Sequence, residues 1–287
     1  MNNKTKITLG LSVLTAGTLA AGATGTLAWF TTNKTATATY NNIKVVGTQG
    51  NLGVEIKAVN GDATIANDAE HATSTATGTG AFTSDVSSKD GINFYQPDWT
   101  SVSGNGDSVA FNKVNPVSGK SGYFTQYQIT ITNKASEDAA TVDVALKGLT
   151  ITATDNKGAA STAIANWVRV AVMTDVTEQD GFFKSTGTGN ETKVYQNVVA
   201  AETSKYIDGT GYEAKAGTIG QVVKTDLAPV QASADLNYKA PNKKWEIAKG
   251  GTFTVGVAVW IEGTMSDNQD IAKNGSISVA MTFVSTN

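Results

Sequence analysis

Apolar and polar positions alternate along much of this chain. Between residues 123 and 132 the odd positions are Tyr, Thr or Ile, whereas the even positions are mostly Gln and Thr. The same period of two recurs at residues 52–57, 142–147, 253–261 and 277–283. Successive side chains of a β-strand point to opposite faces of the sheet, so this period predicts a half-buried strand in each stretch.

These strands predict a mainly antiparallel sandwich. Val168–Met173 is apolar on both faces apart from Arg169, which is typical of a central strand covered on both sides. Clusters of Gly, Asn, Asp and Ser between the strands predict turns, and the helical signal is limited to a short turn at Ser161–Asn166. We therefore expect an all-β fold, an antiparallel jelly-roll-like β-sandwich.

Two polar stretches interrupt the alternation, at about 60–88 and 177–244. Both are rich in Gly, Thr, Ser and Asp and only weakly periodic, and neither has the apolar content of a second core. We expect both to be surface insertions on one sandwich domain that covers residues 43–287.

The first 28 residues have the features of an export signal. Lys4 and Lys6 form a basic start, and an uncharged stretch rich in Leu, Ala, Gly and Thr follows to residue 30. Small residues allow cleavage after Ala23 or after Ala28, while the length would also allow an uncleaved membrane anchor. In each case the rest of the chain lies outside the cytoplasm. We expect a protein that is secreted or at the cell surface, and that contacts a membrane only before cleavage.

An extended arm at residues 29–42 follows the expected signal peptide. It begins with Trp29 and Phe30, and then Ala36, Ala38 and Tyr40 alternate with threonines. The alternation changes parity at Asn41-Asn42, because the next apolar positions are odd-numbered. A change of parity within a strand predicts a β-bulge or a bend. The arm is thus predicted to be a strand that is joined to the domain through a bulge or bend at Asn41-Asn42.

Such an arm has two possible fates. It can pair within its own sheet as an ordinary first strand, or it can add to the open sheet edge of a neighbouring molecule. About five ladder hydrogen bonds at ~1 kcal/mol each, with burial of three aromatic side chains, give roughly 10–14 kcal/mol before costs. Association costs about 4–15 kcal/mol. The energies therefore leave both fates open.

Composition excludes several kinds of site. The chain has no Cys, which excludes disulfides, thiol catalysis and thiolate zinc sites, and its single His71 excludes any site that needs two imidazoles. Arg169 is the sole arginine and the net charge is −3, which argues against a nucleic-acid-binding surface. The sequence also contains no nucleophile elbow or phosphate-binding loop. We expect no enzymatic activity and no catalytic residue.

Some polar and aromatic residues remain candidates for binding. Oxygen-bearing side chains crowd the turn after the strand at 253–261 and could hold Ca²⁺, although acidic turns are more often simply solvated. These four residues are Glu262, Asp267, Asn268 and Asp270. Asp85, Asp90 and Asp98 could supply a carboxylate pair for glycoside hydrolysis, but nothing in the sequence selects a pair. The tryptophans at 99, 167, 245 and 260 could stack on sugars, but such residues in a sandwich more often belong to the core or its rim.

The N-terminus resembles that of the TasA and camelysin family. The resemblance lies in Lys4 to Leu11, in Gly25-Thr26-Leu27-Ala28 and in the aromatic pair that follows. Further on, residues 122–133 resemble a family strand that ends in an Asn-containing turn, and Ile164–Met173 resembles a short helix followed by a strand. The resemblance implies export by a dedicated signal peptidase of Gram-positive bacteria, cleavage after Ala28 and a jelly-roll subunit of a biofilm matrix. It also implies polymerisation, in which the freed N-terminal strand completes the sheet of the next subunit.

The leading hypothesis is a secreted structural subunit of extracellular fibres, with itself as partner and matrix or cell-wall components as further possible partners. The arm residues expected to drive assembly are Trp29, Phe30, Ala36, Ala38 and Tyr40. Two alternatives remain open: a monomeric adhesin or carbohydrate-binding module, and an extracellular protease like those described among camelysin relatives. No His-based zinc motif supports the protease, and calcium is the single cofactor considered.

Overall fold

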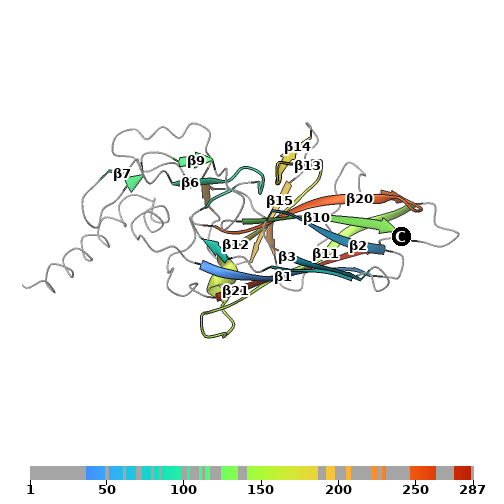
Figure 1. Ribbon diagram of the computed structural model, residues 1–287, viewed down its shortest axis with the longest axis horizontal. Coiled ribbons are helices and arrows are strands. Elements are labelled where there is room, and N and C mark those ends of the chain that lie inside the picture. Colours follow the sequence, from blue (N-terminus) through green and yellow to red (C-terminus); the bar gives the residue numbers. More distant parts are fainter. Residues whose placement is uncertain are drawn as a thin grey trace, which may run out of the picture.

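The chain folds into two β-sheets that pack against each other (Figure 1). The computed structural model describes residues 37–48, 52–60, 63–68, 73–78, 81–83, 86–88, 90–97, 102–103, 110–111, 114–116, 124–134, 141–186, 192–197, 205–207, 222–224, 228–230, 246–262 and 275–285. This architecture confirms the all-β sandwich expected from the alternating sequence. Among the described residues, no helix is long and apolar enough to cross a membrane.

Sheet A contains the first and the last of the described strands. Its order is β19-β11-β21-β1-β4-β3, and β5 also pairs with β1. The strands are β1 (Thr37–Thr48), β3 (Ala63–Asp68), β4 (Thr73–Gly78), β5 (Ala81–Thr83), β11 (Thr141–Thr154), β19 (Glu246–Ala248) and β21 (Gly275–Ser285). All pairings in this sheet are antiparallel except that of β1 with β21, which is parallel.

Sheet B forms the other layer of the sandwich, in the order β18-β15-β12-β20-β10-β2. Its strands are β2 (Leu52–Asn60), β10 (Phe124–Asn133), β12 (Val168–Met173), β15 (Thr192–Asn197), β18 (Ala228–Val230) and β20 (Thr252–Ile261). Every residue of β12 is buried, which confirms the central, doubly covered strand predicted at these positions. Only the pairing of β15 with β18 is parallel in this sheet.

Short elements connect and flank the two sheets. Helix α3 (Thr162–Trp167) lies between β11 and β12, and the hydroxyl of its N-cap Ser161 accepts a hydrogen bond from the amide of Ile164 at 3.3 Å. It confirms the short helical turn predicted there. Small two-stranded ladders are formed by β13 (Val176–Gln179) with β14 (Phe182–Ser185), β16 (Lys205–Ile207) with β17 (Val222–Lys224), β6 (Tyr95–Pro97) with β9 (Val114–Pro116), and β7 (Val102–Ser103) with β8 (Ala110–Phe111).

The two stretches expected to be surface insertions contain strands of both main sheets. Residues 60–88 supply β3, β4 and β5 to sheet A, and residues 177–244 supply β15 and β18 to sheet B. Strands such as β4 are rich in Thr and small residues, so neighbouring strands rather than a strong apolar face of their own define them. In β15 the buried pair Val194 and Tyr195 is surrounded by polar residues, which hides the strand in the sequence.

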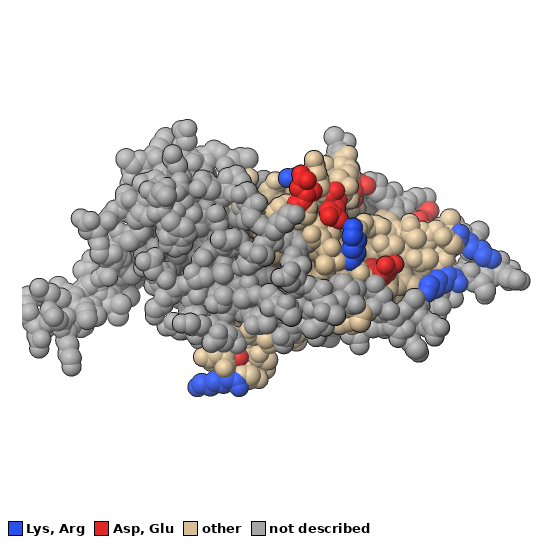
Figure 2. All heavy atoms as spheres, in the orientation of Figure 1, with Lys and Arg blue, Asp and Glu red and all other residues tan. Residues whose placement is uncertain are grey.

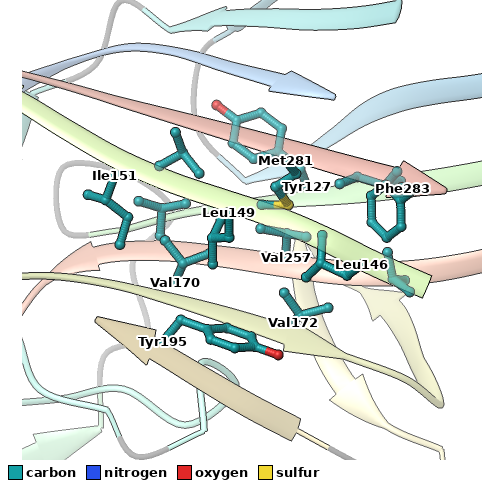
Figure 3. Packing of buried hydrophobic residues seen from close by; sticks show 14 of the residues in the cluster. Tyr127, Leu146, Leu149, Ile151, Val170, Val172, Tyr195, Val257, Met281 and Phe283 are labelled. Atoms are coloured by element: carbon teal, nitrogen blue, oxygen red, sulfur yellow. The ribbon is translucent and has the colours of Figure 1, made fainter. Parts of the chain in front are cut away.

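The main core lies between the two sheets. Figure 3 shows Leu149 of β11 and Met281 of β21 in the same layer as Val170 and Val257 of sheet B. The alternating apolar positions of β2, β10, β20 and β21 all contribute buried side chains to this layer. Each fully buried Val, Leu, Ile or Phe contributes about 1.5–3 kcal/mol, so this layer supplies stability to a chain without Cys.

A second core covers the outer face of sheet B. The covering elements are the β13–β14 hairpin and a segment that we call the strap, residues 86–88 and 90–97. Phe94 of the strap stacks on Phe124 of β10 at 3.7 Å between ring centroids and meets Trp260 of β20 edge-on at 5.4 Å. The centre of sheet B, formed by β12 and the second half of β20, is therefore buried on both faces. In sheet A, by contrast, Thr152 of β11 and Ala280 of β21 are exposed on the outer face.

Candidate assembly site

The described part of the expected arm is the first part of β1. Ala38 and Tyr40 lie in this strand, whereas Ala28, Trp29, Phe30 and Ala36 lie outside the described residues. β1 is an interior strand of sheet A, with β21 on one side and β4 and β5 on the other. The arm position is thus filled by the chain's own residues.

The register of β1 against β21 aligns the apolar positions of the two strands. The core-facing residues of β21 are all buried: Gly275, Ile277, Val279, Met281 and Phe283. In the same order, their partners in β1 are Ala38, Tyr40, Ile43, Val45 and Gly47. Paired positions of neighbouring strands share one face of the sheet, so these five positions of β1 lie on the face of sheet A that is directed at the core.

A bulge at Asn41 produces this alignment. The register against β21 shifts between Tyr40 and Asn42, so that Asn41 is an extra residue in β1. The even-numbered positions before the bulge and the odd-numbered positions after it consequently share one row. The structure confirms the bulge that the change of parity predicts.

On its other side, β1 changes partner at the same place. Thr37–Thr39 pair with β5, and Asn42–Val46 pair with β4. Tyr40 and Asn41 fall between these two paired segments. The residues of β1 before the bulge therefore occupy what we call the acceptor position, the strand position in sheet A between β5 and residues 275–277 of β21.

The far end of β1 is held closely against sheet B. A Cβ atom added at Gly47 would lie 3.0 Å from the Cβ and the carbonyl oxygen of Leu52 and 3.4 Å from Cγ1 of Val54. Gly47 is buried and only residues 49–51 separate β1 from β2. The absence of a side chain at this position allows the two strands to approach each other.

The β5 side of the acceptor position is connected to a buried carboxylate directly after β20. Val86, three residues after the end of β5, forms a parallel bridge with Glu262. Oε2 of Glu262 accepts hydrogen bonds from the Trp260 indole Nε1–H at 3.0 Å and from the Ser88 amide at 3.3 Å. The side chain of Glu262 is 1% exposed. It holds the strap, and through it the end of β5, against sheet B.

Glu262 was one of the four candidate calcium ligands, and the structure places its carboxylate among these buried donors. The other three candidates, Asp267, Asn268 and Asp270, lie outside the described residues. Within the described part of the chain no three Asp, Glu, His or Cys side chains group together as metal ligands. The calcium site stays a prediction.

Gln126 is a structural residue that the sequence analysis missed. Its side chain is buried on the outer face of sheet B, where Nε2 donates to the carbonyl of Gly91 at 2.9 Å and Oε1 accepts from the amide of Phe183 at 3.1 Å. One amide group therefore connects the strap to the β13–β14 hairpin. The signal in the sequence was a polar residue on a strand whose other face is apolar, which also fits exposure to solvent.

The strap approaches sheet B closely at Gly91. This residue has φ of +70°, and a Cβ atom there would overlap the Cβ of Ala171 and lie 3.1 Å from the Cβ of Ala258. Only glycine combines this backbone conformation with so close an approach. Asp90 stabilises the same turn, since its Oδ1 accepts from the amides of Ile92 and Asn93 at 2.9 and 2.8 Å.

The remaining candidate residues from the sequence are buried in the fold wherever the structure describes them. Trp167 and Trp260 are buried rather than presented to a ligand, while Trp99, Trp245, His71, Asp85 and Asp98 lie outside the described residues. Arg169 is also buried, and its Nη1 donates to the carbonyls of Asn166 and Val168 at 2.7 and 3.0 Å.

Charged side chains are scattered over the described surface. Figure 2 shows acidic side chains over the β13–β14 hairpin, where Lys57 of β2 pairs with Glu178 at 2.9 Å. Both side chains of this ion pair are substantially exposed.

No protein-family model matches this chain, and searches of curated proteins and of solved structures find no match either.

Proposed function

We propose that this protein is a secreted structural subunit that assembles with copies of itself. In this proposal the N-terminal segment is removed after Ala28, and the new N-terminal strand of one subunit completes sheet A of the next. The product is an extracellular fibre of a biofilm matrix or cell surface. The role of the protein is mechanical and needs no catalytic residue.

The observation that carries the proposal is the place of β1 in the sheet. The expected arm, residues 29–42, runs into β1 (Thr37–Thr48), yet β1 is an interior strand that pairs in parallel with the last described strand, β21. No turn joins β1 directly to β21, because the chain continues from β1 into β2 of sheet B, so a strand from a second chain can take the same place beside β21. Exchange of an identical element between protomers is a known route to assembly.

Strand exchange lowers the free energy only if the assembled state makes contacts that the monomer lacks. Exchange breaks and remakes the same ladder hydrogen bonds, so these bonds contribute little to the net free energy. Association costs about 4–15 kcal/mol, which the exchanged strand must offset. In our proposal Trp29 and Phe30 are buried against the next subunit, and each would contribute about 1.5–3 kcal/mol. Many contacts along a fibre add to this through effective concentration.

The test is electron microscopy of the secreted protein together with N-terminal sequencing of the same sample. We expect processing after Ala28 and filaments from the processed chain. The variant that lacks residues 29–40 is expected to remain monomeric by analytical ultracentrifugation while circular dichroism still reports a β-sandwich. Filaments of unchanged length from this variant would exclude the proposal.

A matched pair of full-length variants separates loss of the arm from general damage. Ala38→Asp with Tyr40→Asp places charges at core-row positions of the arm, and we expect it to abolish assembly. Thr37→Asp with Thr39→Asp places the same charges on the alternate positions of the same strand and is expected to assemble. Equal behaviour of the two variants would contradict a role for the core row.

A further inference from the structure

The change of partner at the bulge separates β1 into two parts. Up to Thr39 the strand is paired with β5, and from Asn42 it is paired with β4. Asn41, the extra residue relative to β21, lies between these two parts. The pairing of β1 is therefore interrupted at the same place on both of its edges. A single backbone rotation there would release the first part from both neighbours and leave the second part in the sheet.

We infer that the exchanged segment ends at Tyr40, that Asn41 is the hinge, and that the acceptor position between β5 and residues 275–277 of β21 receives this segment from a second copy of the chain. The inference rests on the proposed function and specifies which residues of the two copies meet. In the assembled state the pairs Thr39 with Ala81 and Tyr40 with Ile277 form between subunits.

The second part of β1 is fixed by contacts that the first part does not share. Asn42–Val46 pair with β4 over five residues, and the close approach of Gly47 to Leu52 and Val54 ties the strand to sheet B. The connection to β2 spans only residues 49–51. Moving this part would disturb the packing of both sheets, so the strand opens at the bulge rather than at its end.

The walls of the acceptor position keep contacts outside the segment that leaves. β21 is paired along its other side with β11. β5 is followed within three residues by Val86, which is bridged to Glu262 on sheet B. β21 therefore keeps its place when residues up to Tyr40 move out. β5 loses its ladder with Thr37–Thr39 but stays tethered through Val86, so the position is available to an identical segment.

Pairs of engineered cysteines test the hinge directly, because the chain has no Cys of its own. Paired residues of antiparallel strands have Cα atoms about 4.5–5.5 Å apart, within the range that a disulfide spans. Processed Thr39→Cys protein is mixed with processed Ala81→Cys protein, assembled and oxidised, and mixed disulfides are identified by mass spectrometry. Thr37→Cys with Thr83→Cys is the second pair for the same contact, should the first not fold.

The matched control lies on the other side of the bulge. Lys44→Cys is mixed with Thr75→Cys, which are paired between β1 and β4. The double variant with both substitutions in one chain must form its disulfide internally, which verifies the geometry of this pair. We expect at least ten times more mixed disulfide from the 39–81 mixture than from the 44–75 mixture.

Each other outcome overturns a defined part of the idea. Mixed disulfides from both mixtures would place the hinge beyond Thr48 and overturn the inference, while the proposed function would stand. Filaments without mixed disulfide at 39–81 and 37–83 would overturn strand exchange at this position. Absence of filaments from every processed variant and from the unmodified protein would overturn the proposed function itself.

Discussion

At the scale of single residues, Glu262 shows how a buried charge can support an assembly site without touching the exchanged strand. Its carboxylate accepts from the Trp260 indole and the Ser88 amide, and its backbone is bridged to Val86. Both donors belong to the second core on the outer face of sheet B. Removing the acceptor leaves these donors buried, and a buried unsatisfied donor costs more than an average hydrogen bond contributes.

Replacement of this acceptor is expected to destabilise the fold. Glu262→Ala should lower the free energy of unfolding by about 3 kcal/mol, since hydrogen bonds to charged groups contribute ~1.5–3 kcal/mol. Glu262→Gln keeps one acceptor oxygen in place and should lose roughly half as much. Urea denaturation at neutral pH, followed by tryptophan fluorescence, measures both values.

The control for this prediction is a carboxylate with an exposed partner. Glu178→Ala removes the ion pair with Lys57, whose side chain is 64% exposed. Pairs of this kind contribute about 0–1 kcal/mol, so the variant should unfold almost as the unmodified protein does. A loss at Glu262 no larger than that at Glu178 would show that the buried carboxylate is not what holds the strap.

At the scale of elements, the bulge in β1 predicts what happens when it is removed. Deleting Asn41 brings Tyr40 next to Asn42, and their partners Ile277 and Ser278 in β21 are already adjacent. The shortened strand therefore alternates regularly without losing its core row. On the other side of β1, however, the deletion leaves two steps from Thr39 to Asn42 against four from Thr77 to Ala81, so we expect a small loss of stability in urea. Assembly should be at least ten times slower in light scattering, because the hinge is gone.

Substitution provides the comparison for this deletion. Asn41→Ala keeps the number of residues, and so keeps the bulge, while it removes the asparagine side chain. It should assemble at close to the normal rate. If Asn41→Ala and the deletion slow assembly equally, the side chain of Asn41 matters and the extra residue does not.

The elements also show which features a sequence can predict. The bulge was predictable because a strand with one buried face must keep its parity, and a change of parity needs an extra residue. β15 was not, because Val194 and Tyr195 are its only strongly apolar pair between polar neighbours. The Thr-rich β3 and β4 are defined by pairing with each other and with β1. The role of Glu262 depends on Ser88, a contact between residues far apart in the chain, which no local pattern contains.

At the scale of the whole molecule, periodicity gives the faces of strands but not their neighbours. Nothing in the alternation of β1 or β21 indicates that the first and last described strands pair in parallel. Contacts of such sequence separation are slow to form, because loop-closure entropy is lost before they contribute. β1 is therefore expected to be among the last strands to dock, and until it docks the edge of β21 is open to a strand from another molecule.

An open acceptor position should bind the missing segment as a free peptide. The variant that lacks residues 29–40 is incubated with a synthetic peptide of these residues, and its unfolding temperature is followed by calorimetry. Binding to the folded state alone stabilises it by about 2.7 kcal/mol at a peptide concentration 100 times Kd, which for a domain of this size corresponds to a rise of roughly 5–11 °C. The peptide with Ala38→Asp and Tyr40→Asp puts charges opposite Gly275 and Ile277 and should leave the temperature unchanged. Equal rises in unfolding temperature with both peptides would mean that the peptides do not pair with β21 as β1 does. The acceptor position would then have to be sought at another edge of the sandwich.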